Sequence, residues 1–166
     1  SSQVGDSSVM GQVMAGINVT GEDISKIKYS IMGNDSDVTY NMARMKEVDK
    51  DSSEYQTSSE KFRKKTENGY AYYIIEDIGE EYEENGNSQS EGIQIVKFSK
   101  QLGEESLYQD RQVYNEMVKN MYEGLTLSVT VTYGDGTTEI VDVGLKEVGG
   151  GDNSGKVSDK VAVYVK

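Results

Sequence analysis

The strongest pattern in this chain is a strict alternation of apolar and hydroxyl-bearing residues from position 125 to 133. Gly134-Asp135-Gly136 follows, and a second alternating run ends at Leu145. The apolar set of the first run is Leu125, Leu127, Val129, Val131 and Tyr133. Because successive side chains of a strand point to opposite faces, the segment predicts two antiparallel strands with one face in a core and one in water. The Gly-Asp-Gly tripeptide predicts the turn that joins them.

Three shorter alternating segments lie near the N-terminus, at residues 9–19, 27–31 and 38–42. Gly21-Glu22-Asp23 and Gly33-Asn34-Asp35 separate them and predict turns. Strands that follow one another closely in sequence usually lie side by side. The sequence therefore predicts that the chain opens with a three-stranded meander.

The middle of the chain is more polar. Charged and hydroxyl residues fill the stretch from Lys46 to Gly69, which predicts a long loop with one helical turn around Ser59 to Lys65. Tyr70 to Ile75 is aromatic and β-branched and predicts a strand. A second, acidic loop is expected over residues 80–87, followed by a strand from Gly92 to Ser99.

The period of the apolar positions changes to three or four between residues 104 and 123, which predicts an amphipathic helix. Its apolar positions are Leu107, Tyr114, Met117, Val118 and Met121. Ser106 and Gln109 form a capping-box pattern at its start, and Gly124 suits the position just after its end. A glycine-rich loop from Gly149 and a closing strand over residues 161–165 complete the pattern.

Together these segments amount to about eight strands and one helix. We expect a flexible lead-in at residues 1–8 and a single β-rich domain at residues 9–166. The predicted fold is mainly β, an antiparallel β-sandwich that carries the helix of residues 104–123 in one connection. The alternative is an α+β fold with the helix packed on one sheet.

The composition of the chain excludes more classes of function than its pattern of apolar positions does. The net charge of the 166 residues is −12, which disfavours nucleic acid and anionic membranes as partners. No run of about 20 apolar residues is present, so we expect no membrane insertion. The chain has no Cys and no His, which excludes disulfides, zinc–thiolate sites and a Ser-His-Asp triad within it. Enzymes that use only carboxylates, Lys, Ser or Tyr remain open.

Two short motifs resemble catalytic signatures. Gly150 to Lys156 matches the G-x-x-x-x-G-K part of a phosphate-binding loop, but Val157 stands where Ser or Thr would hold magnesium. Ser58 and Lys61 match the S-x-x-K motif of penicillin-recognising enzymes, without its S-D-N and K-T-G companions. We interpret the first as a turn and the second as a solvated helix start.

Acidic residues in turns offer the candidate metal ligands. Asp35 and Asp37 are the candidates for a structural calcium site, because calcium takes six to eight oxygen ligands. Neither belongs to a complete calcium-binding loop, and carboxylates in turns usually bond to local backbone groups. We therefore expect no cofactor, with calcium as an open alternative.

Tyrosine supplies the candidate binding residues, with 12 copies against two Phe and no Trp. Tyr70 and Tyr72 share one face of the predicted strand, and Tyr73 points to the other. Beside carboxylates, exposed tyrosines can stack on sugar rings or contact a protein. The alternative is that they are the aromatic residues of the core. Carboxylate pairs for glycoside hydrolysis are too numerous among 29 acidic residues to single one out.

The tract LSVTVTYGDGTTE and the Val-rich closing strand resemble immunoglobulin-like and related β-sandwich modules of bacterial cell-surface proteins. The resemblance covers about the last 45 residues and implies a sandwich fold on a cell surface. Ser1 begins the sequence without a methionine, which we interpret as removal of a signal or lipoprotein segment, or as an arbitrary boundary. We expect an extracellular or surface-anchored protein.

Three functions follow from these observations. The first is a non-catalytic secreted or cell-surface module that acts in adhesion, as a spacer or as a binding domain for a protein or glycan. The second is a ligand-binding lipoprotein domain that recognises a glycan or a cationic ligand. The third is a glycosidase that uses only carboxylates.

Overall fold

The computed structural model describes residues 8–86, 91–102, 111–148 and 161–166, and this part of the chain holds ten strands and two helices. Sheet A contains, in order across the sheet, β1 (Ser8–Ile17), β7 (Ile93–Gln101), β3 (Val38–Val48), β5 (Gly69–Gly79) and β4 (Lys61–Thr66). Sheet B contains β10 (Val161–Val165), β9 (Thr138–Glu147), β8 (Leu125–Tyr133), β2 (Ile24–Gly33) and β6 (Glu81–Asn85). The helices are α1 (Ser53–Thr57) and α2 (Arg111–Glu123).

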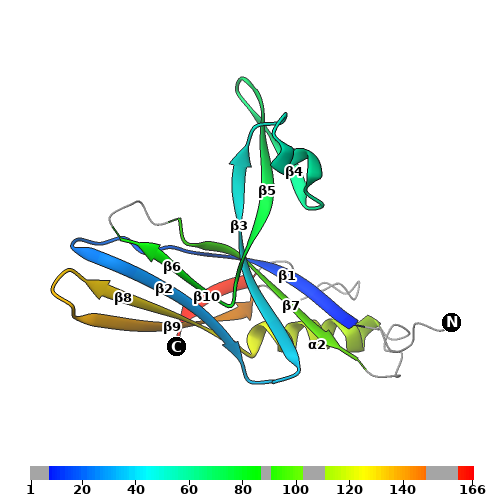
Figure 1. The fold of residues 1–166 in the computed structure, drawn as a ribbon. Helices are drawn as coiled ribbons and strands as arrows, with labels where there is room; N and C mark the ends of the chain where they lie inside the picture. The colour runs from blue at the N-terminus through cyan, green and yellow to red at the C-terminus, as the bar shows by residue number, and fades with distance from the viewer. Residues whose placement is uncertain (1–7, 87–90, 103–110, 149–160) are drawn as a thin grey trace.

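Every pairing between neighbouring strands in these sheets is antiparallel, and the apolar faces of the two sheets enclose one core (Figure 1). The predicted mainly β fold with an accompanying helix is confirmed. The described ranges already hold ten strands, where about eight were expected for the whole chain.

The predicted hairpin of residues 125–145 is confirmed as β8 and β9. Its register pairs Leu127 with Val143 and Thr132 with Thr138. Four of its five alternating apolar residues are buried in the core. In the turn, the Asp135 carboxylate accepts hydrogen bonds from the backbone N–H of Thr137 at 2.9 Å and from its hydroxyl at 2.6 Å. Asp135 is therefore a turn residue here.

The predicted N-terminal meander is wrong. β1 pairs with β7, β2 pairs with β8 and β6, and β3 pairs with β7 and β5. β1, β2 and β3 thus alternate between the two sheets, and each still turns its apolar face to the same core. The alternation of residues specifies which face of a strand is buried, but it carries no information on which strand lies beside it.

Both predicted loops of the middle region contain strands. β4 replaces the helical turn expected around Ser59 to Lys65, and the short helix α1 lies before it. α1 begins after Ser52, whose hydroxyl accepts a hydrogen bond from the Tyr55 backbone at 3.2 Å. β6 occupies most of the expected acidic loop. Both strands lie at sheet edges, where a polar sequence is tolerated because fewer of its side chains are buried.

The helix predicted over residues 104–123 is described from Arg111 onward, and its expected capping residues Ser106 and Gln109 lie outside the described residues. α2 contacts β1 of sheet A and β9 of sheet B. Val118, Met121 and Tyr122 are its buried side chains. The helix thus packs against both sheets, closing one side of the sandwich.

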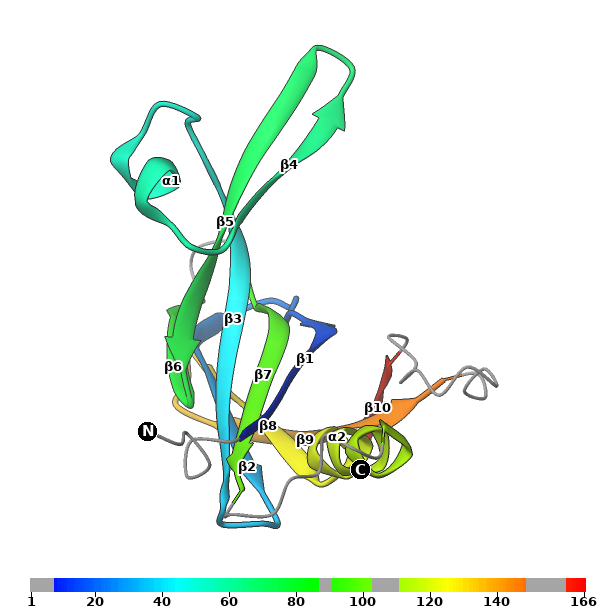
Figure 2. The same cartoon turned by 90° about the vertical axis from the view of Figure 1, so that its right-hand side faces the viewer.

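Sheet A extends beyond the sandwich. β3 pairs with β7 only as far as Ala43, and from Arg44 onward it pairs with β5 alone. The strands continue upward in Figures 1 and 2, together with α1 and β4, and project away from the body. We call residues 44–76 the arm.

Candidate binding surface

The register of the β4–β5 hairpin divides the arm's side chains between two faces. Phe62 lies opposite Tyr73 and Arg63 opposite Tyr72, because a two-residue turn joins Thr66 to Gly69. Since side chains alternate along a strand, Lys61, Arg63 and Lys65 share a face with Tyr70 and Tyr72. Tyr55 of α1 packs against that same face, which we call the α1 face.

Aromatic rings and cations contact one another on the α1 face. The rings of Tyr55 and Tyr72 meet edge to face, with centroids 5.2 Å apart. The Lys61 ammonium lies 4.9 Å from the Tyr55 ring centre, and the Arg63 guanidinium lies 4.1 Å from that of Tyr70. Tyr70 remains 47% exposed. These contacts hold positive charge beside accessible aromatic surface.

The opposite face of the arm also places aromatic rings beside a cation, with fewer residues. Phe62 and Tyr73 stack with centroids 5.3 Å apart and planes within 12°. Lys64 lies 5.4 Å from the Tyr73 ring centre and 5.8 Å from that of Phe62. Cross-strand aromatic pairs of this kind stabilise a hairpin that has little core of its own.

The structure places Tyr70 and Tyr72 on one face and Tyr73 on the other, as the alternation of the sequence predicts. Their part in binding stays a prediction. Sequence reasoning expected carboxylates beside them, whereas Arg63 and Lys64 are the charged residues in contact with Tyr70 and Tyr73. The signal for this was the run KFRKK, which the two-residue turn folds back against YAYY.

Positive charge on the arm is concentrated in β4. Four of the six residues of β4 are Lys or Arg, in a chain whose net charge is −12. Charges in water are screened over about 8 Å at physiological salt. A ligand at the end of the arm therefore meets the cations of β4 more strongly than the acidic sandwich.

An ion-pair network lies at the base of the arm. The Arg44 guanidinium contacts carboxylate oxygens of Glu76 at 3.0 Å and Glu91 at 2.7 Å, and lies 4.9 Å from the Tyr82 ring centre. Lys46 contacts Glu76 at 3.8 Å. Arg44, Lys46 and the two carboxylates line an open cavity of about 570 Å³. The paired charges fix the point where β3 and β5 leave the sandwich.

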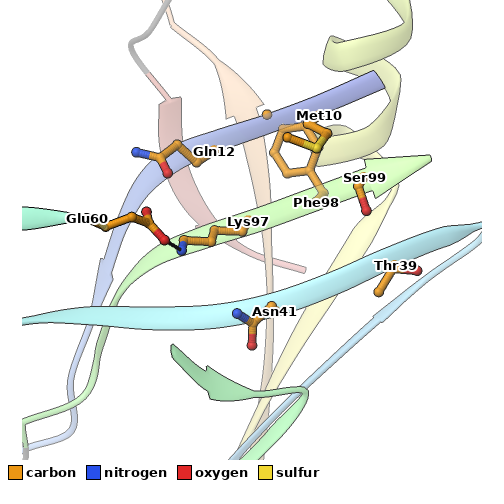
Figure 3. Close-up of a pocket in the computed structure, with 9 residues that line it drawn as sticks. Met10, Gln12, Thr39, Asn41, Glu60, Lys97, Phe98 and Ser99 are labelled. Atoms are coloured by element: carbon orange, nitrogen blue, oxygen red, sulfur yellow. Dashed lines mark hydrogen bonds and ion pairs between the residues drawn. The ribbon is translucent and has the colours of Figure 1, made fainter. Parts of the chain in front are cut away.

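A second hollow of about 490 Å³ lies on the outer face of sheet A (Figure 3). Lys97 points across it to Glu60, at 2.6 Å, and also contacts Asp77 at 2.9 Å. Burial alone would lower the pKa of Lys97, but the hydrogen bonds to Asp77 and Glu60 outweigh that effect and raise it. The amine is therefore protonated at neutral pH and acts as an ion-pair partner rather than a base.

The candidate calcium residues lie in the turn between β2 and β3. The Asp35 carboxylate accepts hydrogen bonds from Lys100 Nζ at 2.8 Å and from the Asp37 backbone N–H at 3.0 Å. The Lys100 hydrogen bond holds the pKa of Asp35 below its usual value. In the described ranges, no group of three or more acidic residues is arranged to hold a metal ion. Calcium binding by Asp35 and Asp37 stays an untested alternative.

Of the two motifs that resemble catalytic signatures, only one lies among the described residues. The Gly150 to Lys156 segment lies outside the described residues. Ser58 bonds to the backbone of Glu60 just before β4, while the Lys61 ammonium points to the Gln56 carbonyl at 3.4 Å. Ser58 and Lys61 therefore form separate hydrogen bonds, and Ser58 does not begin a helix.

Comparison with protein-family models, with characterised proteins and with solved structures gave no match. The resemblance to immunoglobulin-like modules thus stays a prediction. Neither α1 nor the described part of α2 is long and apolar enough to cross a membrane.

Proposed function

We propose that this chain is a non-catalytic secreted or cell-surface module that binds a partner protein or glycan through the α1 face of the arm. The observation that carries the proposal is the exposed cluster of Tyr70, Arg63 and Lys61, held away from an acidic sandwich. Binding residues are commonly placed on segments that a rigid scaffold supports.

The chemistry of the α1 face favours a partner with acidic groups. Arg63 covers part of Tyr70, so a cationic ligand approaching this ring would meet a like charge. A carboxylate or sulfate could instead accept hydrogen bonds from Arg63 and Lys65 while an apolar part of the partner packs on Tyr70. This favours binding of an anionic patch over the cationic ligand of the second hypothesis.

The non-catalytic role is supported by the ion pairs that engage Lys97 and Asp35. Lys97 is held between two carboxylates, and Asp35 is held by Lys100. Groups engaged in this way position the chain and are poorly suited to proton transfer, which needs a pKa near the working pH. The location outside the cell rests on the resemblance to bacterial surface modules.

A binding screen with matched variants tests the proposal. The probes are an array of neutral and anionic glycans and a Glu-rich peptide, measured against the protein itself and against Tyr70→Ala and Arg63→Ala. We expect binding to acid-bearing probes and a loss of about tenfold or more in affinity for each variant. Tyr164→Ala is the control, because Tyr164 also lies beneath a cation, Lys146 at 5.5 Å, but on the sandwich.

Three outcomes would overturn the proposal. The first is no binding to any acid-bearing probe. The second is an equal effect of Tyr164→Ala. The third is hydrolysis of a chromogenic sugar panel, which would replace the module with the carboxylate-only glycosidase. A single-stranded oligonucleotide included as a probe checks the exclusion of nucleic acid, since β4 is basic.

A further inference from the structure

The two sheets each end in an edge strand, and these two strands carry opposite charge. β4 ends sheet A with the sequence Lys-Phe-Arg-Lys-Lys-Thr, and β6 ends sheet B with Glu-Tyr-Glu-Glu-Asn. Edge strands present unpaired backbone groups and can accept a further strand. Each strand places an aromatic residue second, Phe62 in β4 and Tyr82 in β6, with charged residues on either side of it.

The backbone groups that face outward from β4 follow from its register. The Ile75 N–H donates to the Glu60 carbonyl at 3.0 Å. Because hydrogen-bonded and non-hydrogen-bonded pairs alternate in an antiparallel ladder, the backbones of Phe62 and Lys64 face β5. Those of Lys61, Arg63 and Lys65 point away from the sheet. The outward positions of β4 are therefore all cationic.

The same reasoning applies to β6. The Ile31 N–H donates to the Glu80 carbonyl at 3.0 Å, and the Gly86 N–H donates to the Ser25 carbonyl at 3.1 Å. The backbones of Tyr82 and Glu84 thus face β2, and those of Glu81, Glu83 and Asn85 point away. The Glu81 side chain is 67% exposed. The outward positions of β6 carry two carboxylates and no cation.

This arrangement discriminates between pairings. Like charges directly opposite one another destabilise a strand pair, and opposite charges stabilise it. Two β4 strands, or two β6 strands, would therefore repel, whereas β4 beside β6 aligns cations with carboxylates. In both views β4 and β6 lie apart, on the arm and on the body (Figures 1 and 2). The complementary partner of β4 is thus the β6 of another molecule.

We propose that copies of this chain associate head to tail, with β4 of one copy extending sheet B of the next at β6. An antiparallel alignment that sets Arg63 opposite Glu83 also sets Lys65 opposite Glu81, because all four residues turn their backbone groups toward the added strand. Because the two contacting surfaces differ, each bound copy presents a new free edge, and the association continues into linear assemblies. This inference goes beyond the proposed function, and both use the cations of β4.

Charge exchange at the two edges tests it by sedimentation velocity. The β4 variant is Lys61→Glu with Lys65→Glu, the β6 variant is Glu81→Lys with Glu83→Lys, and the combined variant carries all four changes. The control, Glu22→Lys with Glu139→Lys, changes the charge as the β6 variant does, at exposed positions away from both edges. Because the two exchanges cancel, the combined variant keeps the net charge of −12.

At about 0.01 M salt, we expect the average mass of the unmodified protein to rise with protein concentration beyond that of a dimer. At about 1 M salt, we expect it to fall towards that of the monomer. The β4 and β6 variants each weaken association by about tenfold or more, and the control does not. The combined variant associates again. An equimolar mixture of the β4 and β6 variants associates more strongly than either alone, since the basic β4 of one meets the acidic β6 of the other.

A monomer at every concentration and salt would overturn the inference and show that the charges only protect the edges. Association that stops at a dimer, or that the combined variant and the mixture both fail to restore, would also overturn it. The β6 variant leaves the α1 face intact. Its retained binding to anionic probes therefore separates failure of this inference from failure of the proposed function.

Discussion

At the scale of single residues, two buried tyrosines at α2 differ in their hydrogen bonding: Tyr40 of β3 contacts the helix, and Tyr122 belongs to it. The Tyr40 hydroxyl donates a hydrogen bond to the Met121 carbonyl of α2 at 2.7 Å, which ties the helix to β3. The Tyr122 hydroxyl is buried and has no hydrogen-bond partner among the described residues. A buried hydrogen bond stabilises the folded state, whereas a buried polar atom without a partner costs free energy.

This contrast yields a stability prediction. Tyr40→Phe leaves the Met121 carbonyl without its donor, so the free energy of unfolding should fall by about 1–2 kcal/mol. Tyr122→Phe removes only the unpaired hydroxyl and should leave the free energy of unfolding unchanged or raise it by up to about 1 kcal/mol. Urea denaturation of both variants measures the difference. Equal losses in the two would show that Tyr122 has a hydrogen bond in solution.

Tyr122 also predicts a dependence on alkaline pH. Burial, together with the nearby carboxylate of Glu147, raises the pKa of its hydroxyl to about 12. Because the folded protein holds this proton more tightly than the unfolded chain, the contribution is complete below pH 10 and is lost between pH 10 and pH 12. Between pH 10 and pH 12, the free energy of unfolding of the unmodified protein should therefore fall by on the order of 2 kcal/mol more than that of Tyr122→Phe. Urea titrations at pH 9 and near pH 12 check this, and parallel losses in both proteins would contradict it.

At the scale of secondary-structure elements, strands with one apolar and one polar face could be predicted from the sequence. Strands without that difference between their faces could not. β8 buries one face and leaves the other only partly buried, so the alternation of its residues predicts the strand with nearly correct boundaries. β4 buries no residue fully, and it was mistaken for part of a loop. β6 buries only Glu84, a carboxylate that accepts hydrogen bonds from the Glu91 and Gly92 backbones. A buried acid at an edge leaves no apolar signal.

The candidate site was predictable in its tyrosines but not in its cations. Tyr70, Tyr72 and Tyr73 belong to one aromatic segment, and their alternation gave their faces. Placing Arg63 over Tyr70 requires the register of a strand that was not predicted, and placing Tyr55 requires the packing of α1. Contacts of this kind depend on tertiary structure, which one sequence does not specify by local pattern.

The β4–β5 hairpin predicts an effect confined to one element. Gly69 follows the turn with φ of +128°, a backbone conformation that residues with a Cβ rarely adopt. Gly69→Ala should cost about 1–2 kcal/mol and increase hydrogen exchange in β4, while β8 and β9 keep their protection. Gly16→Ala is the control, because a Cβ at Gly16 meets no atom within 4 Å and its backbone is not strained. Equal exchange in the two variants would show that the turn tolerates a side chain.

At the scale of the whole molecule, net charge and charge distribution lead to different expectations. Taken alone, the net charge of −12 disfavours any anionic partner. The fold separates the cations of β4 from the carboxylates of β6 and the sandwich, so both binding proposals depend on local fields. Both should therefore weaken as salt concentration rises.

The continuity of β3 and β5 has a mechanical consequence. Both strands run from the sandwich into the arm without interruption, and β3 is held in the body by its ladder with β7 from Val38 to Ala43. A pull on the arm along the strand direction is therefore a shear load, carried by all the bonds of this ladder together. A load at right angles would instead open them one after another. The molecule is thus built to resist tension in the direction in which its arm projects.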